Sequence, residues 1–243
     1  MKNLETDRKT DLLRPEHDLW KCKAADKYLL NISRDPKFLL PLSQYPKEIE
    51  LEGQWHRRLN KMRGDSRDGD ERGELFGSVD GNVFFYLPLK GNNHEVFIEE
   101  AIDELRQNGK FDVSKIIGLI HSHPNNLRER ILRGGKKQAL SLFDLYLLIR
   151  EGGIVRVMAL AEKDKNLFML CSAETKTDEK NYNQFFDFWW DEMLGRNGDD
   201  LTNKKKRKTL PSFFDFNIAI SAYYKLVLYV GKPNGALKKI APA

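Results

Sequence analysis

Two histidines end an apolar stretch of the chain, and their spacing suggests a metal site. The stretch reads KIIGLIHSHP over residues 115–124, so that a run of Ile and Leu ends on His121, Ser122 and His123. Because side chains alternate between the two faces of a strand, His121 and His123 share one face. Neutral imidazole is a preferred zinc ligand, and a catalytic zinc takes three protein ligands and keeps one position open. We therefore expect a third ligand close to the two histidines in the fold.

Asp144 is the best candidate for the third ligand. It lies near the start of LSLFDLYLLIREGG, residues 140–153, which reads as a helix ending in two glycines. Ser141 and Asp144 are three residues apart, so a helix places them on one face, which can turn toward the end of the histidine strand. Each alone is commoner as a helix cap or a first-turn charge, so only the combination points to a site. Glu129 is the lower-ranked alternative ligand.

Hydrolysis at such a centre also needs a residue that moves a proton, and Glu74 is favoured for this role. Glu74 begins the segment 74–89, ELFGSVDGNVFFYLPL, which the sequence predicts to be a β-hairpin turning at its Asp-Gly pair. Its first strand could run beside the histidine strand.

These residues resemble the signature of the JAMM metalloproteases, also called the MPN+ or Mov34/JAB family. That signature is a Glu in E-x-x-G-x-apolar-x-G, then His-x-His-Pro, then Ser-x-x-Asp. The chain has ELFGSVDG from Glu74, HSHP from His121 and SLFD from Ser141. The expected order of elements also matches: a helix, a hairpin and a second helix before the histidine strand, and closing strands after the Ser/Asp helix.

The resemblance implies a role for each of these residues. His121, His123 and Asp144 would bind Zn2+, Glu74 would act as general acid/base, and Ser141 would stabilise the oxyanion of the tetrahedral intermediate. It implies hydrolysis of the C-terminal amide of ubiquitin or a ubiquitin-like protein, in a conjugate or a precursor. A ubiquitin-like substrate and an activating protein partner are the partners expected.

A second alignment leaves the identity of the general base open. The stretch DERGELFG can also be aligned by Gly73 and Gly77, which puts Asp70 in the Glu position with Glu71 beside it. Glu74 is preferred, because both glycine offsets then fit the signature and the residue starts the strand.

Strands and helices alternate without a βαβ glycine fingerprint, so we expect an α+β, three-layer-like fold with a mixed β-sheet flanked by helices. The resemblance adds that its core is a cytidine-deaminase-like MPN/JAB core. We expect an N-terminal extension over 1–36, a metalloprotease domain over 37–176 and a C-terminal helical extension over 177–243. The apolar segment 213–230 contains several polar residues and is predicted to be a buried helix rather than a membrane span.

Composition narrows the class of protein. The 243 residues include 41 Lys and Arg against 36 Asp and Glu, a balance that does not by itself indicate a nucleic-acid binder. The two cysteines are far apart in the sequence, and the first residues are polar and charged. We therefore expect a cytoplasmic protein without a disulfide framework, a signal peptide or a membrane anchor.

Three other functions remain as alternatives. A non-catalytic MPN-type scaffold would not need the intact His, Ser and Asp set. The basic stretches 127–137 and 203–208 suggest a nucleic-acid-associated protein on the same fold. The nearly equal numbers of basic and acidic residues in the whole chain argue against nucleic acid as a partner. A metal-dependent amidase acting on a small molecule is the weakest of the three.

Overall fold

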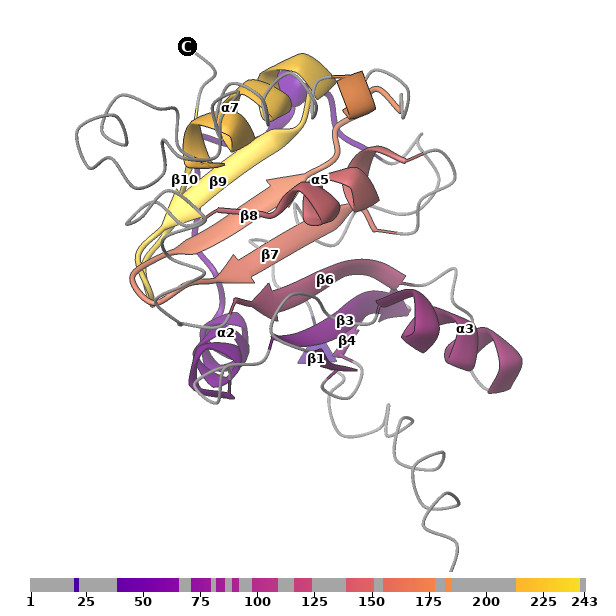
Figure 1. The fold of residues 1–243 in the computed structure, drawn as a ribbon. Coiled ribbons are helices and arrows are strands. Elements are labelled where there is room, and N and C mark those ends of the chain that lie inside the picture. The colour runs from indigo at the N-terminus through magenta and orange to yellow at the C-terminus, as the bar shows by residue number, and fades with distance from the viewer. Residues whose placement is uncertain are drawn as a thin grey trace, which may run out of the picture.

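A mixed β-sheet runs through the protein, with helices packed on it (Figure 1). The strand order is β1-β4-β3-β6-β7-β8-β9-β10-β2, with β5 attached to β3. The predicted α+β fold with helices flanking a mixed sheet is therefore confirmed. The computed structural model describes residues 20–21, 39–65, 71–79, 82–85, 89–91, 98–108, 116–123, 139–150, 155–177, 182–184 and 213–240.

The strands are β1 (Trp20–Lys21), β2 (Glu48–Ile49), β3 (Arg72–Val79), β4 (Asn82–Phe85), β5 (Leu89–Lys90), β6 (Ile116–Ser122), β7 (Val157–Ala161), β8 (Asn166–Leu170), β9 (Val227–Gly231) and β10 (Leu237–Ile240). The helices are α2 (Gly53–Asp65), α3 (Ile98–Asn108), α5 (Leu142–Ile149) and α7 (Phe213–Tyr224), with a short 3-10 helix at Leu42–Gln44.

Three neighbouring strands carry the histidines and their surroundings. β6 lies between β3, to which it is antiparallel, and β7, to which it is parallel. The carboxyl ends of β6 and β7 therefore lie at the same edge of the sheet. β3 also pairs with β4 in antiparallel register up to Val79 opposite Asn82, which confirms the predicted hairpin pairing, while its turn residues lie outside the described ranges.

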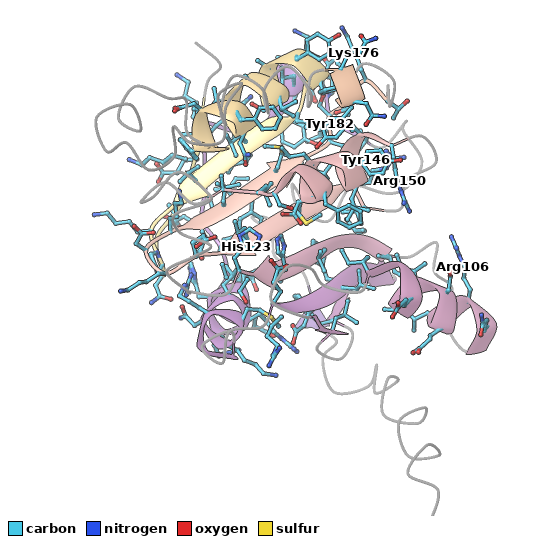
Figure 2. The ribbon with its side chains drawn as sticks, viewed as in Figure 1. Arg106, His123, Tyr146, Arg150, Lys176 and Tyr182 are labelled. Carbon is cyan, nitrogen blue, oxygen red and sulfur yellow. The ribbon has the colours of Figure 1, made fainter. Side chains whose placement is uncertain are left out.

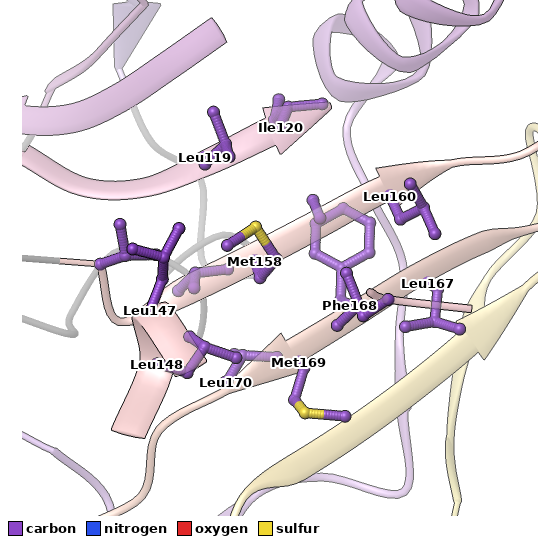
Figure 3. Packing of buried hydrophobic residues seen from close by; sticks show 14 of the residues in the cluster. Leu119, Ile120, Leu147, Leu148, Met158, Leu160, Leu167, Phe168, Met169 and Leu170 are labelled. Atoms are coloured by element: carbon purple, nitrogen blue, oxygen red, sulfur yellow. The ribbon is translucent and has the colours of Figure 1, made fainter. Parts of the chain in front are cut away.

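An aromatic cluster fixes α2 against one face of the sheet. Trp55 is fully buried, and its ring lies 5.1 Å from that of Phe76 and 5.4 Å from that of Phe85. Leu59 and Met62 follow Trp55 at helical spacing and are also buried, as the sequence pattern predicts. On the other face, α5 adds Leu147 and Leu148 to the core beside β7 and β8 (Figure 3).

The C-terminal region differs from the predicted helical extension. α7 ends at Tyr224, Lys225 adopts a left-handed conformation with φ 59°, and β9 then pairs with β8. A left-handed residue commonly ends a helix, and the run Val-Leu-Tyr-Val that follows favours a strand. The prediction that 213–230 forms one helix is therefore wrong, and 227–240 extends the sheet instead. Among the described residues, no helix is both long and apolar enough to cross a bilayer.

Candidate metal centre

The carboxyl end of β6 brings the two histidines together. His121 is level with Gly73 of β3 on one side and Leu160 of β7 on the other. Both imidazoles are buried, and their Nε2 atoms lie 3.2 Å apart. They thus share one face of the strand, as the alternation of side chains predicts.

The first turn of α5 brings Asp144 to the histidines. Its Oδ2 lies 3.2 Å from Nε2 of His121 and 3.6 Å from Nε2 of His123. Ser141 is the N-cap: its hydroxyl accepts from the Asp144 N–H at 3.2 Å, while Asp144 Oδ2 accepts from the Ser141 N–H at 2.7 Å. This capping box fixes the carboxylate in the direction of the histidines.

The side chains of His121, His123 and Asp144 form a buried group that could hold a metal ion. The atoms that face one another are the two histidine Nε2 atoms and Oδ2 of Asp144. Hydrogen bonds alone cannot satisfy all three of these short contacts at once. If both imidazoles donated to Asp144, their two N–H groups would crowd each other across 3.2 Å. Three mutually close donor atoms instead suit one shared cation.

Charge keeps the Asp144 carboxylate ionised. Burial raises its pKa, but the charge and hydrogen bond of His121, followed by those of His123, outweigh this and hold the pKa well below its usual value. The Asp144 carboxylate is therefore ionised at neutral pH, as a metal ligand has to be.

Glu162 contacts His123 on the side of the ring away from Asp144, and the sequence analysis did not identify this residue. Its Oε1 lies 3.1 Å from Nδ1 of His123, the ring nitrogen that does not face Asp144. Glu162 directly follows β7, just as His123 follows β6, and the main-chain oxygen of Glu162 accepts from Nε of Arg63 in α2. The sequence contained one signal that could have identified Glu162: it is an acidic residue that directly follows a strand parallel to the histidine strand.

The structure does not bring Glu74 to this group. Glu74 is level with Ile120 of β6 and so points to the face opposite His121. There its carboxylate oxygens lie 3.1 and 3.2 Å from Nη1 of Arg58, with Nζ of Lys61 at 4.0 Å. This pair joins β3 to α2, because Glu74 is completely buried in the layer between them.

Glu71 is the acidic residue of this stretch that lies at the histidine face. It is three residues before Glu74, and its Oε1 lies 3.9 Å from Nε2 of His123. The side chain is buried, and its main-chain oxygen accepts from the Gly91 N–H at 3.1 Å. Asp70, the other alternative, lies outside the described residues.

Several predictions fall on residues that the structure does not describe. The segment 124–138 contains the alternative ligand Glu129 and the basic stretch 127–137, and the second basic stretch 203–208 lies in another such range. Their roles stay predictions.

Comparison with known proteins identifies no family. A scan against protein-family models finds no match, and a search of curated proteins finds none either. Among solved structures, the ORF273 protein from the Acidianus two-tailed virus matches with a TM-score of 0.33 and 10% sequence identity. The match covers 77% of this chain and 94% of the viral protein. At this level the likeness carries no argument about function.

Proposed function

We propose that the protein is a zinc-dependent hydrolase of the JAMM type, which cleaves the C-terminal amide of ubiquitin or a ubiquitin-like protein. The observation that carries the proposal is the triangle of Nε2 of His121, Nε2 of His123 and Oδ2 of Asp144. Tetrahedral zinc with ligand distances of about 2.0–2.2 Å separates neighbouring ligand atoms by roughly 3.3–3.6 Å. The separations here are 3.2, 3.2 and 3.6 Å.

The hydrogen bonds that the candidate ligands make to other residues also suit a zinc ion. A histidine that binds zinc commonly donates its second ring N–H to a carboxylate, which orients the ring and fixes the tautomer. Glu162 has this relation to His123. Two imidazoles and one carboxylate are also a common ligand set of catalytic zinc, which keeps a fourth position for water or substrate.

Glu71 takes the role of general acid/base in this proposal, in place of Glu74. A zinc ion held by His121, His123 and Asp144 would supply a Lewis acid and would lower the pKa of a coordinated water to about 7. The carboxylate of Glu71 lies 3.9 Å from Nε2 of His123 and is not one of the three candidate ligands. From there it can carry a proton from water to the leaving amine.

Ser141 is suited to stabilise the oxyanion. Its hydroxyl oxygen accepts from the Asp144 N–H, which leaves the hydroxyl proton to be donated. Ser141 is also only half-buried, in contrast to Asp144. The substrate class rests on the resemblance of the three motifs to the JAMM signature.

The first test of the proposal is the metal content of protein purified without added metal. We expect about one zinc per chain by elemental analysis in the wild type and none in His121→Ala/His123→Ala. His56→Ala is the matched control, because it removes a histidine from α2 and should leave the zinc in place. A wild type that contains no zinc and takes up none on titration would overturn the metal centre and the proposed function.

The second test concerns the reaction. The zinc-loaded protein is incubated with ubiquitin, and with ubiquitin-like proteins, that carry an aminocoumarin amide at the C-terminus. Release of the fluorophore, lost on chelation and restored by zinc, supports the proposal. Zinc binding without hydrolysis of any of these amides, with and without an added conjugation-enzyme partner, would leave a metal-binding scaffold.

A further inference from the structure

A buried asparagine of α7 holds the chain just before the helix that carries Asp144. Asn217 is completely buried, and its Oδ1 accepts from the Leu140 N–H at 3.0 Å. Its Nδ2 donates to the Leu140 main-chain oxygen, also at 3.0 Å. One side-chain amide thus satisfies both main-chain polar groups of a residue 77 positions away in the sequence.

Leu140 directly precedes the capping box. Its neighbour Ser141 is the N-cap of α5, and the Ser141 N–H is bound by Asp144 Oδ2. The first main-chain bond of α5 also starts here, since the Leu145 N–H donates to the Ser141 oxygen at 3.1 Å. A displacement of Leu140 would therefore move the group that orients the Asp144 carboxylate.

α7 is itself fixed to the sheet. Phe216, Ile220 and Tyr224 are completely buried, and after Tyr224 the chain enters β9, which pairs with β8. The ring of Tyr182 bridges α5 and α7, at 5.8 Å from Tyr146 and 6.3 Å from Tyr224; Figure 2 shows Tyr146 and Tyr182 beside each other at α5. The strand β6, which leads to the two histidines, and the helix α7, which carries Asn217, are thus both fixed to the same sheet.

We propose that Asn217 is a positioning residue for the metal ligand Asp144, so that α7 is part of the frame of the metal centre rather than an appendage. The inference rests on the proposed metal site. A side-chain amide presents one donor and one acceptor side by side and so matches a peptide group. An apolar side chain of similar size would leave the N–H and C=O of Leu140 buried without these partners.

The test compares Asn217→Leu, which keeps approximately the volume and loses both hydrogen bonds, with two controls in α7. Ile220→Val shortens a buried side chain of the same helix, and Ser221→Ala removes a hydroxyl that donates to the Ile218 oxygen within the helix. Asn217→Gln keeps both polar groups one methylene further out and serves as a second variant if the leucine variant does not fold.

Two measurements are made on each variant. Amide hydrogen exchange of metal-free protein, followed at the Ser141 and Asp144 N–H groups, reports on the capping box. The zinc dissociation constant, from competition with a chromophoric chelator, reports on the metal site. We expect Asn217→Leu to speed exchange at both amides and to weaken zinc binding roughly 10- to 100-fold. The two controls should lower the melting temperature. They should leave the zinc dissociation constant and the exchange rates of the Ser141 and Asp144 amides as in the wild type.

The outcomes separate this inference from the proposed function. If zinc affinity and exchange at Ser141 and Asp144 in Asn217→Leu match those of the two controls, Asn217 only stabilises the fold and the inference is overturned. If wild-type protein binds no zinc, the proposed function fails, while faster exchange in Asn217→Leu alone would still show that Asn217 holds Asp144.

Discussion

The carboxylate of Glu162 lies 3.1 Å from Nδ1 of His123, on the side of the ring away from Asp144. This relationship follows from the parallel pairing of β6 and β7, since each of the two residues comes one position after the end of its strand. A carboxylate at Nδ1 holds the proton there and leaves Nε2 with its lone pair toward the other two candidate ligands, His121 and Asp144.

Glu162→Gln should therefore weaken zinc binding. The amide oxygen still accepts from Nδ1 but lacks the charge that makes the imidazole a stronger ligand, and outer residues of this kind contribute roughly 10- to 100-fold to metal affinity. Competition with a chelator measures the effect, and Glu48→Gln, which neutralises an exposed carboxylate on β2, is the control. An unchanged dissociation constant would mean that Glu162 only fills space beside His123.

Glu71 and Glu74 should respond differently to the same substitution. Glu71→Gln should lower the rate of amide hydrolysis roughly 10²- to 10⁴-fold, because it removes the proposed proton carrier, with zinc content and melting temperature preserved. Glu74→Gln should leave the rate unchanged below the unfolding transition and lower the free energy of unfolding by about 1–3 kcal/mol, because it takes the charged partner from Arg58. Rate measurements combined with urea unfolding distinguish the two roles. If Glu74→Gln lost activity but kept full stability, the role of general acid/base would belong to Glu74 instead of Glu71.

Asp144 should make the stability of the metal-free protein depend on pH in the acid range. Because its pKa is held well below the usual 3.8 by His121 and His123, its contribution is complete above about that pH and is lost as the pH falls through the lowered value. Asp144→Asn keeps an oxygen for the capping box and removes the charge. The difference in urea midpoint between wild type and this variant should therefore be larger at pH 5 than at pH 2. A difference that does not change with pH would contradict the cause assigned to the pKa shift.

Much of the local structure was predictable because it depends on short-range patterns. The spacing of Trp55, Leu59 and Met62 is that of one helix face and coincides with the buried face of α2, and the alternation along β6 places His121 and His123 on one face. The three-residue offset of Ser141 and Asp144 is that of a capping box, which the structure contains.

The remaining features depend on register and on contacts between distant segments. A shift of one residue between β3 and β6 exchanges the faces of a strand, so the sequence alone could not decide between Glu71 and Glu74. Asn217 carries no local signal at all, because its partner is the main chain of Leu140 and not a side chain. The apolar run at 213–230 contains a change from helix to strand that the sequence analysis missed, since hydrophobic periodicity alone does not distinguish a short buried strand from a buried helix.

Gly118 provides a test of how tightly β6 is packed between its neighbours. A Cβ at this position would lie 2.4 Å from the Val157 main-chain oxygen and 2.5 Å from Cζ of Phe76, the residue opposite it on β3. Because the oxygen belongs to the sheet and the ring packs on Trp55, neither can yield without moving a strand. Gly118→Ala should lower the free energy of unfolding by roughly 1–3 kcal/mol and, since His121 follows on the same strand, also weaken zinc binding.

Gly64→Ala is the matched control for this substitution. A Cβ there would meet no atom within 4 Å, and the residue lies in α2, where alanine is favoured over glycine by roughly 0.5–1 kcal/mol. Urea unfolding of both metal-free variants should therefore give midpoints on opposite sides of the wild type. A Gly118→Ala variant as stable as the wild type would show that β3 and β7 can separate around β6. The close approach of Phe76 to the histidine strand would then have no part in fixing the candidate metal centre.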